Sequence, residues 1–359
     1  MAAGADDWSL YSYDASQGAA IFFAVFLTVL GCYQIYQSFI RYRWKKFGGV
    51  MTWATTASAL TTIGVDSVWI SGFVCRSISI HYDQNINLYI AQFVLVLMGP
   101  PLYAAAEYFI LSRLLAYLPY HAPIHPGRVL STFILLSAVV ESLTASGAAN
   151  SAGTGRKPAQ RQRGLDCLKA ALIIQCLIET LFFSLVVVLE RRCRRAGSFP
   201  KHVRLVVYVL YVTSLMVLVR CIVRTIEGFQ AATCDAGGLP CGYIAEHEWI
   251  FFVWETANIT LFVVILAIFH PGRFLPRSSK LYLDPYDGKT ERVGPGFGKA
   301  DKRPFLVTVF DPFNLAGILT GKGMKLNKFW EEFQPIYNGG ELIPVEHSAT
   351  DTVPKAVAV

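Results

Sequence analysis

Seven long apolar runs limit the folds open to this chain more than any other feature of its sequence. Crossing about 30 Å of hydrocarbon takes roughly 20 helical residues, and each run is long enough to do so. The runs mix Leu, Phe, Val and Ala without the period-2 alternation of barrel strands, so helices are favoured. The predicted spans are Ala19–Ile40, Val50–Phe73, Leu88–Leu115, Val129–Ala149, Leu165–Leu189, Leu205–Phe229 and Glu248–Phe269.

Composition points to the same class of protein. The 359 residues are 53% hydrophobic and 16% charged, whereas soluble domains are about a quarter charged. We therefore predict an all-α integral membrane protein with one seven-helix transmembrane bundle over residues 19–270. Residues 1–18 form a short extracellular or lumenal N-terminus in this prediction. Residues 271–359 are rich in Pro and Gly and contain no spanning run, so a cytoplasmic and largely disordered tail is expected.

The positions of Lys and Arg predict the orientation, because cytoplasmic loops hold an excess of both. With the N-terminus outside, fifteen basic residues fall in the inner segments and five in the outer ones. The N-terminus is therefore predicted outside and the C-terminus in the cytoplasm. The outer loop Ser151–Gly164 disagrees, because it carries four basic residues. On this topology the net charge of +7 anchors cytoplasmic loops and does not indicate nucleic-acid binding.

Charged residues within the spans are the candidate functional residues. A charge at a helix centre costs about 2.5 to 3.5 kcal/mol, so each calls for a partner or a purpose. Their spacing and depth predict a polar cavity that opens outward, with an outer network of mixed charge and acidic groups at its floor. The candidates are Asp66, Glu107, Glu141, Glu179, Arg220, Arg224, Glu227, His247, Glu248 and Glu255.

A purely structural alternative stands beside the cavity. The arginines and glutamates of the last two spans could pair only to fix helix packing, and His247 could be a solvated residue at a helix end. Deep carboxylates outnumber deep arginines, however, and packing alone does not account for that excess. Gly99, Pro100 and Pro101 predict a kink in the third span, either for packing or beside a wet cavity.

The remaining motifs limit the chemistry. Cys234 and Cys241 lie in the last outer loop and could form a disulfide or remain two free thiols. The sequence has no phosphate-binding loop, no His/Cys cluster with metal spacing, no nucleophile arrangement, and no lysine in the last span for a retinal Schiff base. We therefore predict no catalytic site, cofactor or metal, and a protein that is not an enzyme.

The last two spans carry a recognisable pattern. Arg220, Arg224 and Glu227 are spaced as Arg-x-x-x-Arg-x-x-Glu, and a Gly-Tyr pair precedes His247-Glu248 at the start of the last span. With the terminal His270-Pro271-Gly272, this pattern resembles the fungal RTA-like, or lipid-translocating exporter, family. Glu255 stands where that family usually has Asp. Upstream, Gly72-Phe73-Val-Cys-Arg76 and the Pro101–Tyr108 stretch also resemble the family, whereas Asp66 and Glu141 are each displaced by one turn from the expected acids.

The resemblance implies a seven-helix protein of the plasma membrane, or alternatively of an endomembrane, that exports or flips sphingoid long-chain bases. It also implies resistance to sterol-like amphiphiles and, in one branch, porphyrin traffic. The expected partners are the lipid bilayer and a membrane lipid or amphiphilic small molecule. An ammonium head group would suit a cavity with surplus carboxylates. The alternative function is a seven-helix lipid sensor or receptor that signals through its tail.

Overall fold

We analysed a computed structural model of the chain, which describes residues 15–43, 65–82, 85–124, 126–151, 157–197, 199–234, 243–278, 280–284, 289–294, 336–338 and 341–343. Side chains are described over these ranges except at 65–67, 231–234, 245–246 and in the last two segments.

Six helical segments of the described chain are long and apolar enough to cross a membrane, which makes this an integral membrane protein. Large apolar side chains such as Phe22, Val29 and Leu177 stay exposed on them, as expected for a surface that faces lipid. The segments are α1 (Gln17–Ile35) with the π-helical η1 (Tyr36–Arg41), α4 (Ile86–Tyr117), α5 (Pro126–Ser151), α6 (Pro158–Arg195), α7 (Lys201–Cys234), and α9 (Glu248–Ile250) with the π-helical η4 (Phe251–Ala257) and α10 (Asn258–Ile268).

A further helix, α3 (Val65–His81), corresponds to the second predicted span. Residues 50–64 of that span lie outside the described residues, and the helix runs on past the predicted end at Phe73 to His81. The polar residues Arg76 and Ser79 hid this extension from a hydropathy reading, although both are buried among neighbouring helices. The count of seven spans and the orientation stay predictions.

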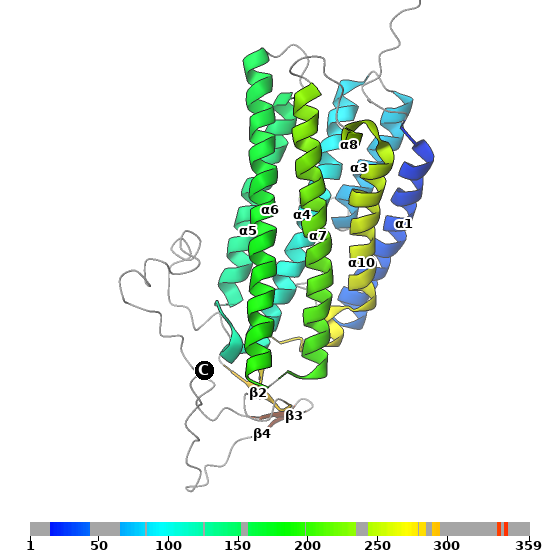
Figure 1. Cartoon of the computed structure of the whole chain (residues 1–359). Helices are drawn as coiled ribbons and strands as arrows, with labels where there is room; N and C mark the ends of the chain where they lie inside the picture. The colour runs from blue at the N-terminus through cyan, green and yellow to red at the C-terminus, as the bar shows by residue number, and fades with distance from the viewer. Residues whose placement is uncertain are drawn as a thin grey trace, which may run out of the picture.

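The helices run alongside one another as a bundle (Figure 1), and their contacts close it into a ring. Each of α1, α3, α4, α5, α6 and α7 contacts the next, and α10 closes the ring against both α7 and α1. Helix α4 also contacts α7 across the bundle, and its residues from Tyr103 to Leu118 are mostly buried. One continuous apolar core therefore surrounds the polar groups described below.

The predicted proline site lies in α4 without ending it. Pro100 has no N–H, so the carbonyl of Val96, four residues earlier, loses its helical donor. The indole Nε1 of Trp69 replaces that donor and lies 3.2 Å from the Val96 oxygen. Gly99 leaves room for the ring, since a Cβ there would lie 2.5 Å from it. The irregular turn is thus buried in protein, which is where a membrane helix tolerates one.

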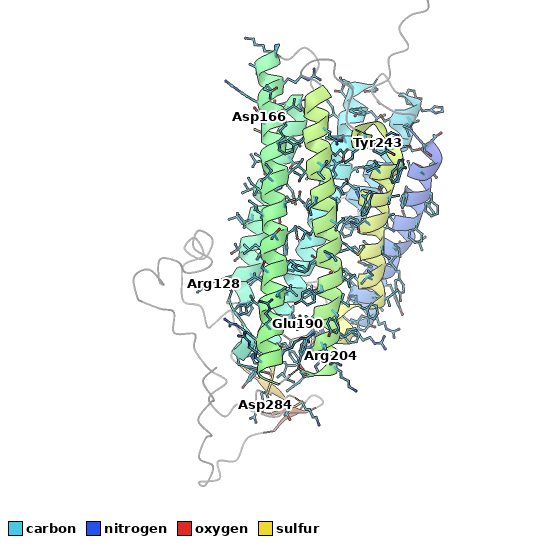
Figure 2. The ribbon with its side chains drawn as sticks, in the orientation of Figure 1. Arg128, Asp166, Glu190, Arg204, Tyr243 and Asp284 are labelled. Atoms are coloured by element: carbon cyan, nitrogen blue, oxygen red, sulfur yellow. The ribbon has the colours of Figure 1, made fainter. Side chains whose placement is uncertain are left out.

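The two ends of the bundle are distinct (Figure 2). Asp166 and Tyr243 lie at one end, and Arg128, Glu190, Arg204 and Asp284 lie at the other. Helix α6 begins at Pro158, so the second half of the predicted outer loop Ser151–Gly164 is helical and that boundary was wrong. Gly147 and Gly164 allow close contact there: a Cβ on Gly147 would lie 2.9 Å from the Gly164 carbonyl oxygen.

Short strands occur in the described parts of the tail. Four short strands form an antiparallel sheet in chain order, and residues 281–283 are buried against the bundle end, where the first strand contacts α4. The sequence analysis did not predict these strands, and the largely disordered state of the rest of the tail stays a prediction. The Pro-rich and Gly-rich composition hid the short apolar run Leu281–Leu283, which is buried at the bundle end. The strands are β1 (Leu281–Leu283), β2 (Glu291–Val293), β3 (Ile336–Asn338) and β4 (Glu341–Ile343).

Candidate functional site

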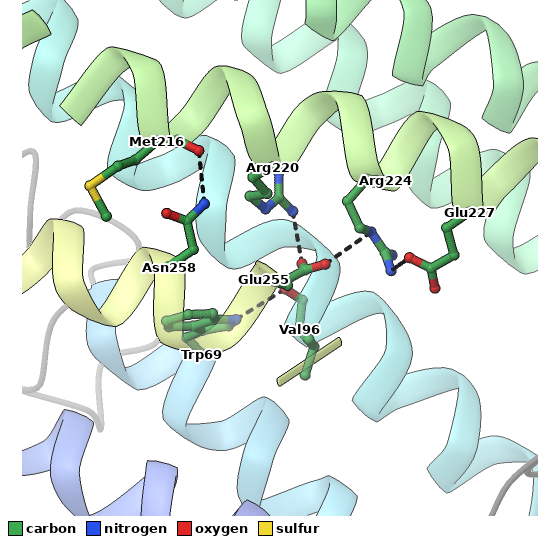
Figure 3. A network of polar contacts seen from close by, with 8 residues as sticks. All are labelled: Trp69, Val96, Met216, Arg220, Arg224, Glu227, Glu255 and Asn258. Atoms are coloured by element: carbon green, nitrogen blue, oxygen red, sulfur yellow. Dashed lines mark hydrogen bonds and ion pairs between the residues drawn. The ribbon is translucent and has the colours of Figure 1, made fainter. Parts of the chain in front are cut away.

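Two arginines of α7 and one glutamate of η4 form a buried ion-pair network (Figure 3). Arg220 and Arg224 are four residues apart and therefore share a helix face. Arg220 Nη2 lies 2.9 Å from Glu255 Oε1, and Arg224 Nε lies 3.0 Å from Glu255 Oε2. Arg220 and Glu255 are each only 2% exposed. The structure brings together three residues that the sequence analysis placed in one outer network.

The network continues towards the bundle end that holds Tyr243. Arg224 Nη1 donates to Glu227 Oε2 at 2.7 Å, within one turn of α7. On the other side, Asn258 Nδ2 donates to the Met216 carbonyl at 2.8 Å and so joins α10 to α7. A crevice of about 10 Å³ beside Glu255 has room for about one water molecule, so the network is closed in this conformation.

Glu248 belongs to a second ion pair rather than to this network. Arg76 Nη2 of α3 lies 2.6 Å from Glu248 Oε1, and the backbone N–H of Ser16 donates to Glu248 Oε2 at 2.8 Å. The Arg76 guanidinium also lies 4.8 Å from the centre of the Phe251 ring, within cation–π range. The prediction of one continuous outer network was therefore wrong. The wider π-helical turns at 251–257 change the faces that a regular helix would give to Glu248 and Glu255.

Two acids lie deeper in the bundle. Glu107 of α4 is 0% exposed and Glu179 of α6 is 1% exposed, and they are close enough to repel each other. The Tyr108 hydroxyl donates to Glu179 Oε1 at 2.6 Å, while the Thr213 and Ser214 hydroxyls of α7 approach Glu107. Neither glutamate forms an ion pair with an arginine, lysine or histidine of the described residues.

Of the other predicted acids, Glu141 is not part of this cluster. Glu141 is half-buried on α5, and over the described ranges no hydrogen bond or ion pair reaches its side chain. Asp66 lies in the first turn of α3, but its side chain falls outside the described residues.

His247 and the cysteine pair complete the predicted set. His247 Nδ1 lies 2.8 Å from the Tyr243 carbonyl, and the two rings stack at 4.0 Å. This contact agrees with a residue that caps a helix end and not with one that lines the cavity. The side chains of Cys234 and Cys241 lie outside the described residues, so their disulfide stays a prediction.

Sequence reasoning missed a polar contact at the opposite end of α1. Gly272 N–H donates to His270 Nδ1 at 3.1 Å, which leaves the His270 Nε2–H to donate to Ser38 Oγ at 3.2 Å. Gln34 and Gln37 of the same segment each donate to an α10 carbonyl at 3.0 Å. Polar residues repeated every three or four positions in an otherwise apolar span are the signal that could have revealed this contact.

These contacts divide the charges of the candidate site into two groups; the buried Arg128 of α5 lies apart from them, at the end of the bundle that holds Asp284. Arg76, Arg220 and Arg224 are each paired with a carboxylate. Glu107, Glu141 and Glu179 are not paired with any basic side chain of the described chain. The spans therefore hold an acidic surplus, and two of its three members lie side by side in the bundle interior. Such a site can hold protons or attract a cation.

The fold and these contacts define a helical integral membrane protein with a buried charge network and an acidic interior. The family model described as "RTA1 like protein" matches residues 66–278, more than half of the chain, and we conclude that the chain belongs to the RTA1-like family. The resemblance seen in the last two spans is thereby confirmed.

Named relatives agree with this assignment. The chain is 30% identical to the "Lipid-translocating exporter-like protein RTA1" of Leptosphaeria maculans over 84% of its own length, and spans only 58% of that relative. It is 27% identical to "Protoporphyrin uptake protein 1" of Saccharomyces cerevisiae over 55% of this chain and 63% of that protein. It is 23% identical to "Probable lipid transporter atnI" of Emericella nidulans over 74% of this chain and 68% of that protein. No solved structure matches significantly.

Proposed function

We propose that the protein translocates amphiphiles with a cationic head group, such as sphingoid long-chain bases, across a fungal membrane. The observation that carries the proposal is the adjacent pair of buried acids, Glu107 and Glu179, with no basic partner among the described residues. Relatives named as a lipid-translocating exporter-like protein and a probable lipid transporter support the lipid class. Export of such compounds would confer resistance to them.

The head group would bind where it relieves the largest electrostatic cost. Two neighbouring carboxylates in a low-dielectric interior cannot both be ionised cheaply, so they hold a proton or a cation between them. An ammonium group would supply that cation and three N–H donors. Glu141 would form a further binding point on the path. The Arg220, Arg224, Glu227 and Glu255 network would close the pathway on the outer side.

The topology that belongs to this proposal has seven spans, with residues 1–18 outside and the tail in the cytoplasm. Figure 2 supports this assignment, because Arg128 and Arg204 lie at the same end as the tail residue Asp284. Cytoplasmic segments carry such an excess of basic residues. The proposed location is the plasma membrane, with an endomembrane as the alternative.

Reconstitution tests the proposal directly. The full chain in liposomes should move a labelled sphingoid base between leaflets, and Glu107→Gln and Glu179→Gln should each reduce the rate at least tenfold. Glu190→Gln is the matched control, because Glu190 lies on the same helix as Glu179 but forms an ion pair with the largely exposed Arg194. Parent-like rates in both interior variants, at equal protein incorporation, would refute the proposal.

The sensor alternative gains support from one observation: the tail is attached to the bundle. Arg113 Nη2 of α4 donates to the carbonyls of Pro276 and Arg277 at 2.8 and 2.7 Å. The Tyr117 hydroxyl donates to Glu291 at 3.1 Å. Deleting the chain after Gly294 keeps these contacts and removes the remaining tail. Loss of resistance with intact translocation in liposomes would favour a sensor, and retention of both would favour a translocator.

A further inference from the structure

A groove of about 630 Å³ lies where the last helix passes into the tail. The segment after the His270-Pro-Gly turn forms one wall, and the first two strands contribute Leu281 and Glu291. Two arginines, Arg273 and Arg277, line the groove, and both are exposed. The candidate functional site does not use this groove, because that site lies within the helices.

The backbone of the groove is held in a fixed shape. Arg113 donates to the carbonyls of Pro276 and Arg277, so the segment between the two lining arginines is tied to α4. Leu275, in the same segment, is buried in the core. A rigid wall places both guanidinium groups without a further loss of backbone freedom on binding.

The charge of the groove is positive and largely unused. Neither Arg273 nor Arg277 forms an ion pair with another described residue, and the exposed Lys280 follows directly. Glu291 is the single acid among the lining residues, and its Oε1 already accepts the Tyr117 hydroxyl. Unpaired guanidinium groups suit phosphate, to which arginine can donate two parallel hydrogen bonds.

The position of the groove selects a lipid over a free anion. Ile268 and Phe269 at the end of α10 are exposed apolar residues, at 61% and 37%, as expected where a helix still faces acyl chains. Arg273 follows within about one helical turn of them, so the groove begins where the lipid-facing surface ends. An anionic lipid can place its acyl chains on the exposed apolar residues at the end of α10 and its head group in the groove.

We propose that this groove binds the phosphorylated head group of an anionic phospholipid from the leaflet on the tail side of the membrane. Basic pockets at the cytoplasmic ends of membrane helices recognise such head groups, with a contribution from each basic residue. The bound lipid would fix the turn between α10 and the tail sheet. Phosphoinositides fit best, because several phosphates can occupy a groove of this size together.

The test uses the purified full-length protein, delipidated in detergent, with phosphatidylinositol 4,5-bisphosphate as the probe and phosphatidylcholine as the neutral comparison. Affinity is measured by native mass spectrometry. Replacing both arginines, Arg273→Gln with Arg277→Gln, should weaken phosphoinositide binding about 30-fold. The matched control, Arg195→Gln with Arg204→Gln, removes two exposed charges from the same end of the bundle and should weaken binding less than threefold.

Three results would overturn the proposal. They are equal losses in the two double variants, phosphatidylcholine binding as tight as the phosphoinositide, and inorganic phosphate competing at the same concentration as the lipid. The last result would identify a free anion as the ligand. If the double variant does not fold, Arg277→Gln alone should still weaken binding about fivefold. Binding is measured without transport, so this test and that of the proposed function fail independently.

Discussion

Glu255→Gln should be the most destabilising single change in the buried ion-pair network, because it removes the carboxylate that forms an ion pair with Arg220. After the change, Arg224 still has Glu227 at 2.7 Å. Arg220 is 2% exposed and keeps no other carboxylate of the described residues within ion-pair distance. An uncompensated buried charge of this kind costs about 3 to 5 kcal/mol of unfolding free energy.

Replacing Arg220 instead of Glu255 should lower the free energy of unfolding by a smaller amount. In Arg220→Met, Glu255 retains Arg224 Nε at 3.0 Å, so we expect a loss of about 1.5 to 3 kcal/mol, the value of a hydrogen bond to a charged group. The double variant Arg220→Met/Glu255→Met leaves no orphaned charge between these two positions. Because apolar replacements of a buried pair are often neutral, this variant should be more stable than Glu255→Gln alone.

The assay is unfolding of the purified protein in mixed micelles, titrated with SDS and followed by helical circular dichroism. Arg194→Gln is the control, because that arginine is 58% exposed and its pair with Glu190 should be worth less than about 1 kcal/mol. A loss below about 1 kcal/mol for Glu255→Gln would refute the reasoning. So would a double variant whose loss equals the sum of the two single losses.

Three further predictions concern folding. Trp69→Phe leaves the Val96 carbonyl without a hydrogen-bond donor and should lower the free energy of unfolding by about 1 to 3 kcal/mol in the same SDS titration. The control is Trp249→Phe at an exposed position, which should lower it by less than about 0.5 kcal/mol. Gly99→Ala should cost about 1 to 3 kcal/mol because the new Cβ meets a ring, while Gly18→Ala, with open space around it, should raise stability by about 0.5 to 1 kcal/mol. Burial, helped by a nearby arginine, lowers the pKa of His121 from 6.5 to about 4, so the unfolded chain takes up a proton that the folded chain does not. The free energy of unfolding should therefore fall as pH drops from about 6.5 to 4. His121→Gln should reduce the dependence of the melting temperature on pH over this range. Equal pH dependence of the melting temperature in the parent and the variant would contradict the prediction.

The sequence was sufficient for features that depend on local spacing. Span length follows from membrane thickness and helix rise, so six described spans appear close to their predicted positions. Arg220 and Arg224 share a face because they are four residues apart, and Glu255 is their partner as expected. The excess of buried acid over base was likewise visible in the sequence alone.

The ion-pair partners of residues on different helices could not be predicted from their spacing along the sequence. Arg76 and Glu248 are 172 positions apart, and their pairing depends on how α3 packs against the last helix. The π-helical turns at 251–257 also have no local signature, although they decide which face carries Glu255. Trp69 illustrates the same limit, because its donor role exists only where a proline on a neighbouring helix frees a carbonyl.

The separation of the two charge groups bears on which substrates the proposed site would accept. Arg76, Arg220 and Arg224 already have carboxylate partners, so an anionic substrate would have to break an ion pair of 2.6 to 3.0 Å before it could bind them. A cationic head group would have no ion pair to break, because Glu107 and Glu179 form none with a basic side chain of the described chain. The free-energy cost of forming a new ion pair is lowest when neither charged group must first break an existing pair. The site as proposed therefore selects cations because the arginines are occupied, and not only because acids are present.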